Sequence, residues 1–498
     1  MIWFVYAPAL LILAGVVMRL VPASLGERTH RIIAAISMVL AAAFIAFTPS
    51  SGWALQARYH LLSDTPAYVR LALDGLSMVT SLALLLGAAW GALARRQGDT
   101  AVGWSDWVPL SVTLFVLLAA NPLTLLIAWS TFALVRVVAS LQESDETSGL
   151  VIGAELASLA TLLAATYRLG LDGLSTPFSP MGPEGLQGWL VAISALLRMG
   201  LFPLQPEHPS RRNLRLSAAL TGLYLLLRTV GELPALAIAA ALLGLGSAIM
   251  AALSSAAAHD TNKVWGWLLQ HMLFVGILAA TLGSESRLAG LGALICVAWG
   301  ARVIMRDREQ PASGWDLVGT SALGGIVPTL GWSVWAASLG ALSNLRSPWP
   351  MVAAGLGFAV CAWTMGHNLR AVTATHPAWW WDLLRWQDVW RGLPALLLVA
   401  LGIWPSLLDK AEIWPIALGV AALTSTSLAL GWLRRKGTDR ESRASHDKKP
   451  KTALRSTVAA LERVRANIVQ IDVTLREHAL LAWTALAAAA LGLWLQGR

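Results

Sequence analysis

Long apolar runs recur along almost the whole of this 498-residue chain, and they constrain its fold more than any other feature. Hydrocarbon offers no hydrogen-bond partner, so the backbone of such a run must satisfy its own N–H and C=O groups, as a helix does. Only 13% of the residues are charged, against roughly 25% in soluble domains. We therefore expect an all-α, polytopic membrane protein with about sixteen transmembrane helices.

Hydropathy separates these runs into individual expected spans. Most are long enough to cross a bilayer, although the fourth and the fourteenth are short. The spans cover residues 2–22, 32–48, 69–92, 107–120, 122–141, 149–168, 186–204, 215–231, 233–256, 264–283, 287–304, 317–342, 350–370, 393–408, 413–433 and 478–495.

Basic residues are distributed unevenly between the connections, and this predicts the orientation of the chain. The positive-inside rule places connections after odd-numbered spans in the cytoplasm, and an even number of spans then leaves both termini outside. Connections after even-numbered spans hold only scattered basic residues. Those after odd-numbered spans hold Arg28, Arg31, Arg95, Arg96, Arg211, Arg212, Arg215, Arg306, Arg308, Arg385, Arg391, Arg434, Arg435, Lys436, Arg440, Arg443, Lys448, Lys449 and Lys451.

A charged stretch divides the chain into three expected parts. Residues 1–433 form a transmembrane core, residues 434–477 a cytoplasmic segment, and residues 478–498 a final transmembrane helix. Within the cytoplasmic segment, 434–452 reads as a solvated linker, and apolar residues spaced three and four apart then predict an amphipathic helix. That helix either lies on the bilayer surface or braces neighbouring helices or a partner subunit.

Two ionisable residues fall at matching depths in adjacent spans. Arg136 lies about a turn and a half before the end of the fifth span, and Glu155 lies as deep in the sixth. Because a short turn joins these spans, they are antiparallel neighbours and the two side chains can pair. Charges inside a membrane are costly, so the pair is a candidate for an ion pathway. The alternatives are a structural ion pair or an arginine that reaches to the interface.

Three further residues are candidates for the same pathway. Arg198 precedes the run Gly200–Pro206, whose two prolines can free carbonyl groups, although a simple helix end is an equal reading. His271 lies inside the tenth span, where an imidazole can relay protons or serve as a hydrogen-bonded core residue. Lys263, at the mouth of that span, is either an entry residue or an ordinary cytoplasmic anchor.

The sequence offers no catalytic motif of its own. It contains no phosphate-binding loop, metal-ligand spacing or nucleophile elbow, so we expect no cofactor, no metal and no catalytic residue. Cys296 and Cys361 lie in apolar runs and read as small core residues. The net charge of +9 does not indicate nucleic-acid binding, because no basic face accompanies a soluble fold and topology accounts for the arginines.

Several motifs, in order along most of the chain, resemble the antiporter-like membrane subunits of respiratory complex I. Relatives of that family occur in membrane hydrogenases, Mrp cation/proton antiporters and the DabB subunit of inorganic-carbon pumps. The matching motifs are Leu73–Ser77, Asn121–Trp129, Leu197–Leu204, His259–Val264, Gln270–Met272 and Gly402–Pro405.

The chain also departs from the pattern of the pumping members of that family. Ser130 follows Trp129 where those members have a glutamate, and Arg198 stands in place of the lysine of the seventh span. The lysine of the Asp-x-Lys motif falls at Asn262, with Lys263 beside it. Arginine does not exchange its proton near neutral pH, so the usual glutamate–lysine exchange cannot operate.

The resemblance implies two inverted five-helix repeats near spans 4–8 and 9–13, and a C-terminal lateral extension. It implies a subunit of a complex-I-related energy-converting complex in a bacterial inner membrane, which couples proton movement to partner subunits. Two alternatives remain open within it. One is a DabB-like subunit of an energy-coupled pump for inorganic carbon. The other is a non-conducting structural subunit, while an autonomous solute carrier lies outside the resemblance.

Overall fold

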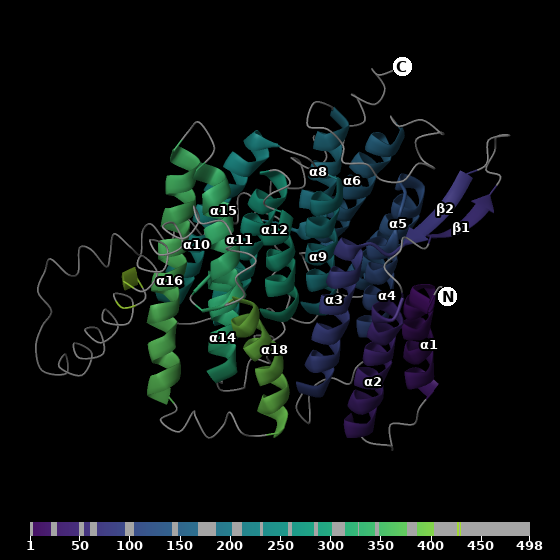
Figure 1. The fold of residues 1–498 in the computed structure, drawn as a ribbon, viewed down its shortest axis with the longest axis horizontal. Helices are drawn as coiled ribbons and strands as arrows, with labels where there is room; N and C mark the ends of the chain where they lie inside the picture. The colour runs from purple at the N-terminus through teal and green to yellow at the C-terminus, as the bar shows by residue number, and fades with distance from the viewer. Residues whose placement is uncertain are drawn as a thin grey trace, which may run out of the picture.

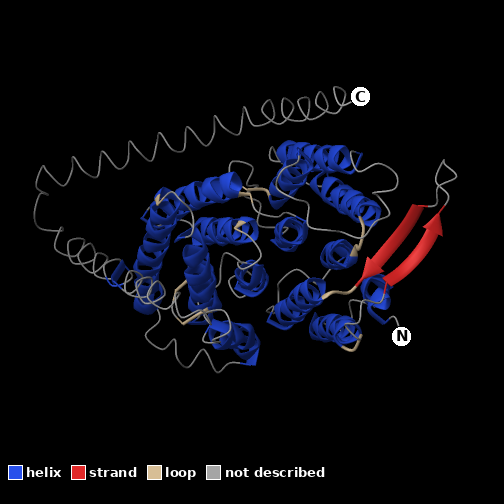
Figure 2. Ribbon diagram, turned by 45° about the horizontal axis from the view of Figure 1, so that its top comes forward, coloured by secondary structure: helices blue, strands red, loops and turns tan. Residues whose placement is uncertain are grey.

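The computed structural model describes most of the first 402 residues of the chain. It covers residues 3–20, 27–48, 54–59, 67–94, 104–141, 148–167, 186–201, 212–229, 233–256, 261–282, 287–300, 314–326, 328–343, 348–375, 386–402, 426–427 and 429. In these residues the chain is a bundle of helices with one two-stranded sheet, which projects from the bundle near the N-terminus (Figures 1 and 2).

The described helices follow one another along the chain in the order of the apolar runs. A 3-10 turn, Trp3–Val5, leads into the first of them. The helices are α1 (Tyr6–Leu20), α2 (Glu27–Ala46), α3 (Gly75–Ala94), α4 (Trp104–Leu118), α5 (Pro122–Leu141), α6 (Ser148–Tyr167), α8 (Leu186–Met199), α9 (Arg212–Thr229), α10 (Pro234–Ala256), α11 (Thr261–Thr281), α12 (Arg287–Ile295), α14 (Gly314–Gly324), α15 (Leu330–Ser343), α16 (Trp349–Thr375) and α18 (Trp386–Gly402).

Helix length and side-chain exposure identify a multi-pass membrane protein. Within the described residues, seven helices are long and apolar enough to cross a bilayer, and four shorter apolar helices accompany them. Large apolar side chains also face outward, which suits a lipid-facing surface and would be costly in water. Examples are Leu13, Ile36, Leu134, Leu163, Leu242 and Leu356. The polytopic, all-α prediction is confirmed.

The small sheet was not predicted from the sequence. Strand β1 (Ala54–Tyr59) pairs antiparallel with β2 (Ala67–Ala72), with Ala54 opposite Ala72. The expected third span began at residue 69, so its first residues belong instead to β2, and α3 begins only at Gly75. Asp74 caps that helix, because its Oδ1 accepts a hydrogen bond of 2.7 Å from the Ser77 N–H.

The expected span 317–342 is not one helix, and this prediction was wrong. It consists of α14 and α15, separated by a turn in which Gly325 has a φ of 69°. The Ile326 N–H donates 2.8 Å to the Ser321 carbonyl, which closes the end of α14 in the manner of a Schellman motif. Pro328 has no N–H to continue the helix, so a break forms here.

The expected span 186–204 also ends differently from the prediction. It ends as α8 at Met199. In the expected span 287–304, a π-helical turn, Cys296–Gly300, continues α12, and residues 301–304 lie outside the described residues. The segment 434–477, the final span 478–498 and most of span 413–433 lie outside the described residues. The number of sixteen helices, the inverted repeats and the three-part division of the chain stay predictions.

Candidate functional site

The predicted pair of Arg136 and Glu155 is present, and it is buried. Only six connecting residues separate α5 from α6, so the helices run antiparallel and pack together. Arg136 lies five residues before the end of α5, and Glu155 lies seven residues after the start of α6. The Arg136 Nη1 donates to Glu155 Oε1, with 5% of Arg136 and none of Glu155 exposed. Connection length and depth were sufficient to predict this contact.

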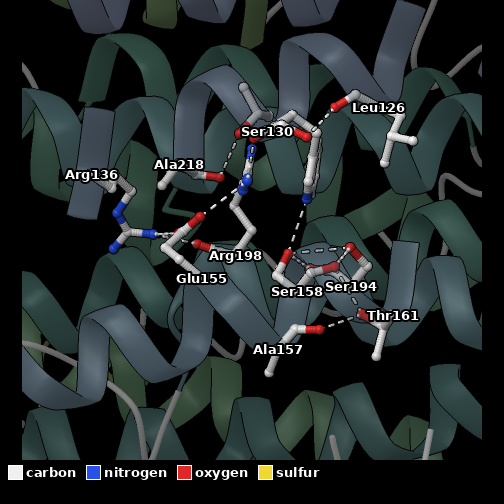
Figure 3. Close-up of polar contacts among 12 residues, drawn as sticks. Leu126, Ser130, Arg136, Glu155, Ala157, Ser158, Thr161, Ser194, Arg198 and Ala218 are labelled. Carbon is white, nitrogen blue, oxygen red and sulfur yellow. Dashed lines mark hydrogen bonds and ion pairs between the residues drawn. The ribbon is translucent and has the colours of Figure 1, made fainter. Parts of the chain in front are cut away.

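Arg198 joins the same pair from a third helix, which the sequence did not predict. It is the next-to-last residue of α8, and its Nη2 lies 3.0 Å from Glu155 Oε2 (Figure 3). Arg136 Nη1 also donates 3.1 Å to the backbone carbonyl of Arg198. We name Arg136, Glu155 and Arg198 the ion triad. Its carboxylate lies between two guanidinium groups, so each oxygen of Glu155 faces one arginine.

A left-handed glycine ends α8 directly after the ion triad. Gly200 has a φ of 60°, and its N–H donates 3.1 Å to the Leu197 carbonyl. A side chain is strongly disfavoured in this conformation, which explains glycine at this position. The helix therefore ends at Met199, earlier than the simple helix end expected at Pro203, and this places Arg198 at a helix C-terminus.

Aromatic rings hold the Arg198 guanidinium. Its Cζ lies 3.7 Å from the ring centroid of Trp129 and 4.8 Å from that of Phe132, both on α5. Arg198 Nη2 also donates 2.9 Å to the Trp129 carbonyl. Ring faces attract a cation, and the attraction grows when water is excluded. Arg198 is fully buried, so these contacts help to retain a charge that hydrocarbon disfavours.

A second layer of hydrogen bonds fixes Trp129. Its indole Nε1 donates 3.0 Å to the Ser158 hydroxyl on α6, and that hydroxyl donates 2.8 Å to the Ser194 carbonyl on α8. All three side chains are buried. The same three helices that supply the ion triad are therefore joined again one turn away.

Ser130 follows Trp129 but does not join the ion triad. Its hydroxyl donates 2.7 Å to the Leu126 carbonyl within α5 (Figure 3). The serine supplies no carboxylate, so the ion triad has two positive groups and one negative group. Among the described residues, no other carboxylate forms an ion pair with it.

His271 lies apart from the ion triad, in a neutral environment. It is fully buried in α11, and its Nδ1 lies 2.9 Å from the Gly244 carbonyl on α10. A carbonyl only accepts, so Nδ1 carries the proton and Nε2 keeps a lone pair. Neither Nε2 nor the neighbouring Gln270 amide has a hydrogen-bond partner among the described residues. The structure therefore separates His271 from the three arginine and glutamate candidates.

Aromatic side chains connect His271 to the break between α14 and α15. The imidazole stacks on Trp335, with ring centroids 5.1 Å apart, and Trp335 contacts Phe358 at 4.9 Å. A Cβ on Gly325 would lie 2.2 Å from Trp335 Cδ1, so the indole fills the space beside the break. We name His271, Trp335 and Phe358 the aromatic cluster.

The remaining candidates are less informative. Lys263 lies in the first turn of α11, but its side chain is outside the described residues. Cys296 and Cys361 are buried and unpaired, as expected for core residues. Within the described ranges, no group of three or more His, Cys, Asp or Glu side chains could hold a metal ion.

The sequence analysis did not predict a further polar group, which lies at the C-terminal end of α9. Arg228 Nη2 lies 3.1 Å from Asp74 Oδ2, and Arg228 Nη1 donates to the Tyr224 hydroxyl. That hydroxyl donates 2.6 Å to the Leu117 carbonyl at the end of α4. The spacing of Tyr224 and Arg228, four residues apart on one helix face, was the available indication.

The fold and the buried charges define a polytopic all-α membrane protein with ionisable groups in its interior. No protein-family model and no curated protein matches the sequence itself. Solved structures do match in fold. A chain of the Mrp complex from Dietzia sp. DQ12-45-1b aligns with a TM-score of 0.68 and 17% identity, over 99% of this chain and 62% of that one.

Two respiratory complexes give similar matches. A chain of respiratory complex I from Thermus thermophilus has a TM-score of 0.63 and 18% identity, over 84% of this chain and 99% of that one. A chain of the membrane-bound sulfane sulfur reductase, an archaeal respiratory membrane complex, has a TM-score of 0.63 and 16% identity, over 82% and 77%. This chain therefore has the fold of membrane subunits of these complexes, and it spans about three fifths of the Mrp chain.

Proposed function

We propose that the chain is an antiporter-like subunit of a multi-subunit, energy-converting membrane complex, and that it moves protons. The observation that carries the proposal is the ion triad, which is buried beside the helix end at Gly200. Ionisable groups inside a membrane are costly, and ion pathways and proton relays are among the functional sites that they mark. Helix ends at depth are the usual place for such sites in transporters.

Within this proposal, Glu155 is the proton carrier of the ion triad. It is the carboxylate that both arginines contact, and Arg198 stays charged throughout. A proton on Glu155 would leave two guanidinium groups without a counter-charge. Proton uptake therefore requires that one arginine moves away, and this couples the proton to a change in structure. His271, whose Nε2 holds a free lone pair, is the second proton carrier.

Two alternative functions fit the same arrangement of residues. In the first, the subunit drives a partner that takes up inorganic carbon, a role suggested by the sequence resemblance and by the missing glutamate at Ser130. In the second, the ion triad only joins α5, α6 and α8, and nothing is conducted. The dense hydrogen bonding of Trp129, Ser158 and Ser194 beside the ion triad favours this structural role.

Proton translocation by the purified complex in sealed vesicles tests the proposal. Glu155→Gln and His271→Gln are expected to abolish translocation in complexes that still co-purify with their partners. Thr131→Val is the matched control, because Thr131 is exposed on α5 and bonds only to Ile127 in its own helix. If both variants translocate protons as well as the control does, the structural alternative holds.

Orientation and location are part of the same proposal. We expect both termini outside the cytoplasmic membrane of a bacterium and the 434–477 segment inside, because arginines cluster in alternate connections. A cysteine placed at Ser442 should resist a membrane-impermeant thiol reagent in intact cells. Labelling of this cysteine from outside would show that the predicted orientation is wrong.

A further inference from the structure

Arg136 occupies an unusual position for a simple ion-pair partner. Its Nη1 atom donates to two oxygens at once, Glu155 Oε1 and the backbone carbonyl of Arg198. That carbonyl belongs to the last turn of α8, which ends at Met199. The last four carbonyls of a helix lack partners within it and carry partial negative charge.

A carboxylate oxygen and a helix-terminal carbonyl are the ligands with which membrane proteins bind alkali cations. Discontinuous helices present such carbonyls to sodium or protons at depth. Hard cations of this kind prefer oxygen ligands and need several of them. In this chain the place between the two oxygens is filled by a nitrogen of Arg136, which is itself 95% buried.

We propose that Arg136 is a tethered cation that fills a latent alkali-cation site, formed by Glu155 Oε1 and the Arg198 carbonyl. The wild-type chain therefore does not bind sodium or potassium at the ion triad. In transport terms, which rest on the function proposed above, Arg136 makes the subunit select protons over metal cations.

The charges of the ion triad support this assignment. With Arg136 present, the group has two cations and one anion, so a further metal cation would be repelled on both sides of the carboxylate. Without Arg136, the carboxylate and Arg198 cancel. A bound sodium ion would then restore the wild-type charge, and it would find the same two oxygens free.

Cation binding to the purified complex is the experiment. Thermal unfolding is compared in 100 mM NaCl, KCl and choline chloride, for the wild type and for Arg136→Met, which keeps an unbranched apolar side chain but removes the charge and the guanidinium group. The wild type should show no difference between the salts. For Arg136→Met with a dissociation constant of about 10 mM, sodium should raise the ratio of folded to unfolded protein roughly tenfold.

Two further variants separate the tethered charge from mere packing. Arg136→Lys keeps a tethered cation and should stay indifferent to sodium. Arg136→Met combined with Glu155→Gln lacks the carboxylate and should also lose the response. If Arg136→Met does not fold in choline, its recovery by sodium but not by choline gives the same answer.

Two results would overturn the inference, and a third would separate it from the proposed function. Stabilisation of the wild type by sodium or potassium would show that the site is open despite Arg136. Absence of any sodium response in both Arg136→Met and Arg136→Gln would show that the oxygens form no site. Failure of proton translocation in the wild type, together with sodium binding by Arg136→Met, would remove the proposed function and leave the latent site standing.

Discussion

The two breaks in the helix bundle, at Gly200 and at Gly325, have the same backbone conformation and opposite chemistry. Each break is a glycine with positive φ directly after a helix. Arg198 lies two residues before the first break, and Leu323 lies two residues before the second. The first closely follows Arg198 of the ion triad, and the second lies against Trp335 and Phe358 of the aromatic cluster.

This difference shows that the backbone geometry of a helix break does not by itself determine whether the break can bind or respond to ions. A break frees backbone groups wherever it occurs, but only a charged side chain beside it makes the site responsive to ions. Among the described residues from α10 to α18, His271 is the one buried ionisable side chain apart from cysteine. We expect the first break to depend on charge balance, and the second on packing and one neutral hydrogen bond.

The largest effect is expected at Glu155. Glu155→Gln leaves two buried guanidinium groups without a counter-charge, which should lower the free energy of unfolding by about 3–5 kcal/mol. Thermal unfolding in detergent measures the loss. A loss below about 1 kcal/mol would mean that charge balance does not stabilise the first break, and the proposed difference between the two breaks would be wrong.

The next largest effect is expected from filling the second break. Gly325→Ala adds left-handed strain of about 1–2 kcal/mol and an overlap with Trp335 and Phe358 that should cost about 1–3 kcal/mol more. Gly200→Ala carries the strain and serves as the reference. The same thermal measurement on both variants tests whether packing is the additional constraint at Gly325, and equal losses would contradict it.

A smaller effect is expected at His271. His271→Leu leaves the Gly244 carbonyl without its donor, so the free energy of unfolding should fall by about 1–3 kcal/mol. His271→Gln keeps an N–H donor and should lose about 1 kcal/mol or less. If the free energy of unfolding falls as much in both variants as in Glu155→Gln, the second break depends on more than packing and one neutral hydrogen bond.

The sequence predicted those contacts that depend on neighbouring helices. Arg136 and Glu155 could be paired because a short connection fixes both the direction and the relative depth of α5 and α6. Arg198 could be recognised as unusual, but its contact with Glu155 depends on where α8 packs after the long segment 168–185. That position is set by tertiary packing, which no spacing rule supplies.

Two structural features were missed for different reasons. The break at Gly325 has a local indication, the run Gly324–Pro328, which hydropathy averages away because every residue in it is uncharged. The sheet was missed because the apolar residues of β2 run on into those of α3. Asp74 was the available boundary, since a capping residue between two apolar runs separates a strand from a helix.

The contact of Asp74, Tyr224 and Arg228 has a mechanical consequence. It ties the start of α3, the end of α4 and the end of α9 together at one end of the bundle. These contacts resist separation of the three helices where they are joined. We therefore expect the helices to move apart mainly at their other ends, which are the end of α3 and the starts of α4 and α9. Arg212 begins α9 at that far end, after the connection that follows Gly200, and any opening of the bundle in this half should therefore be widest beside the ion triad.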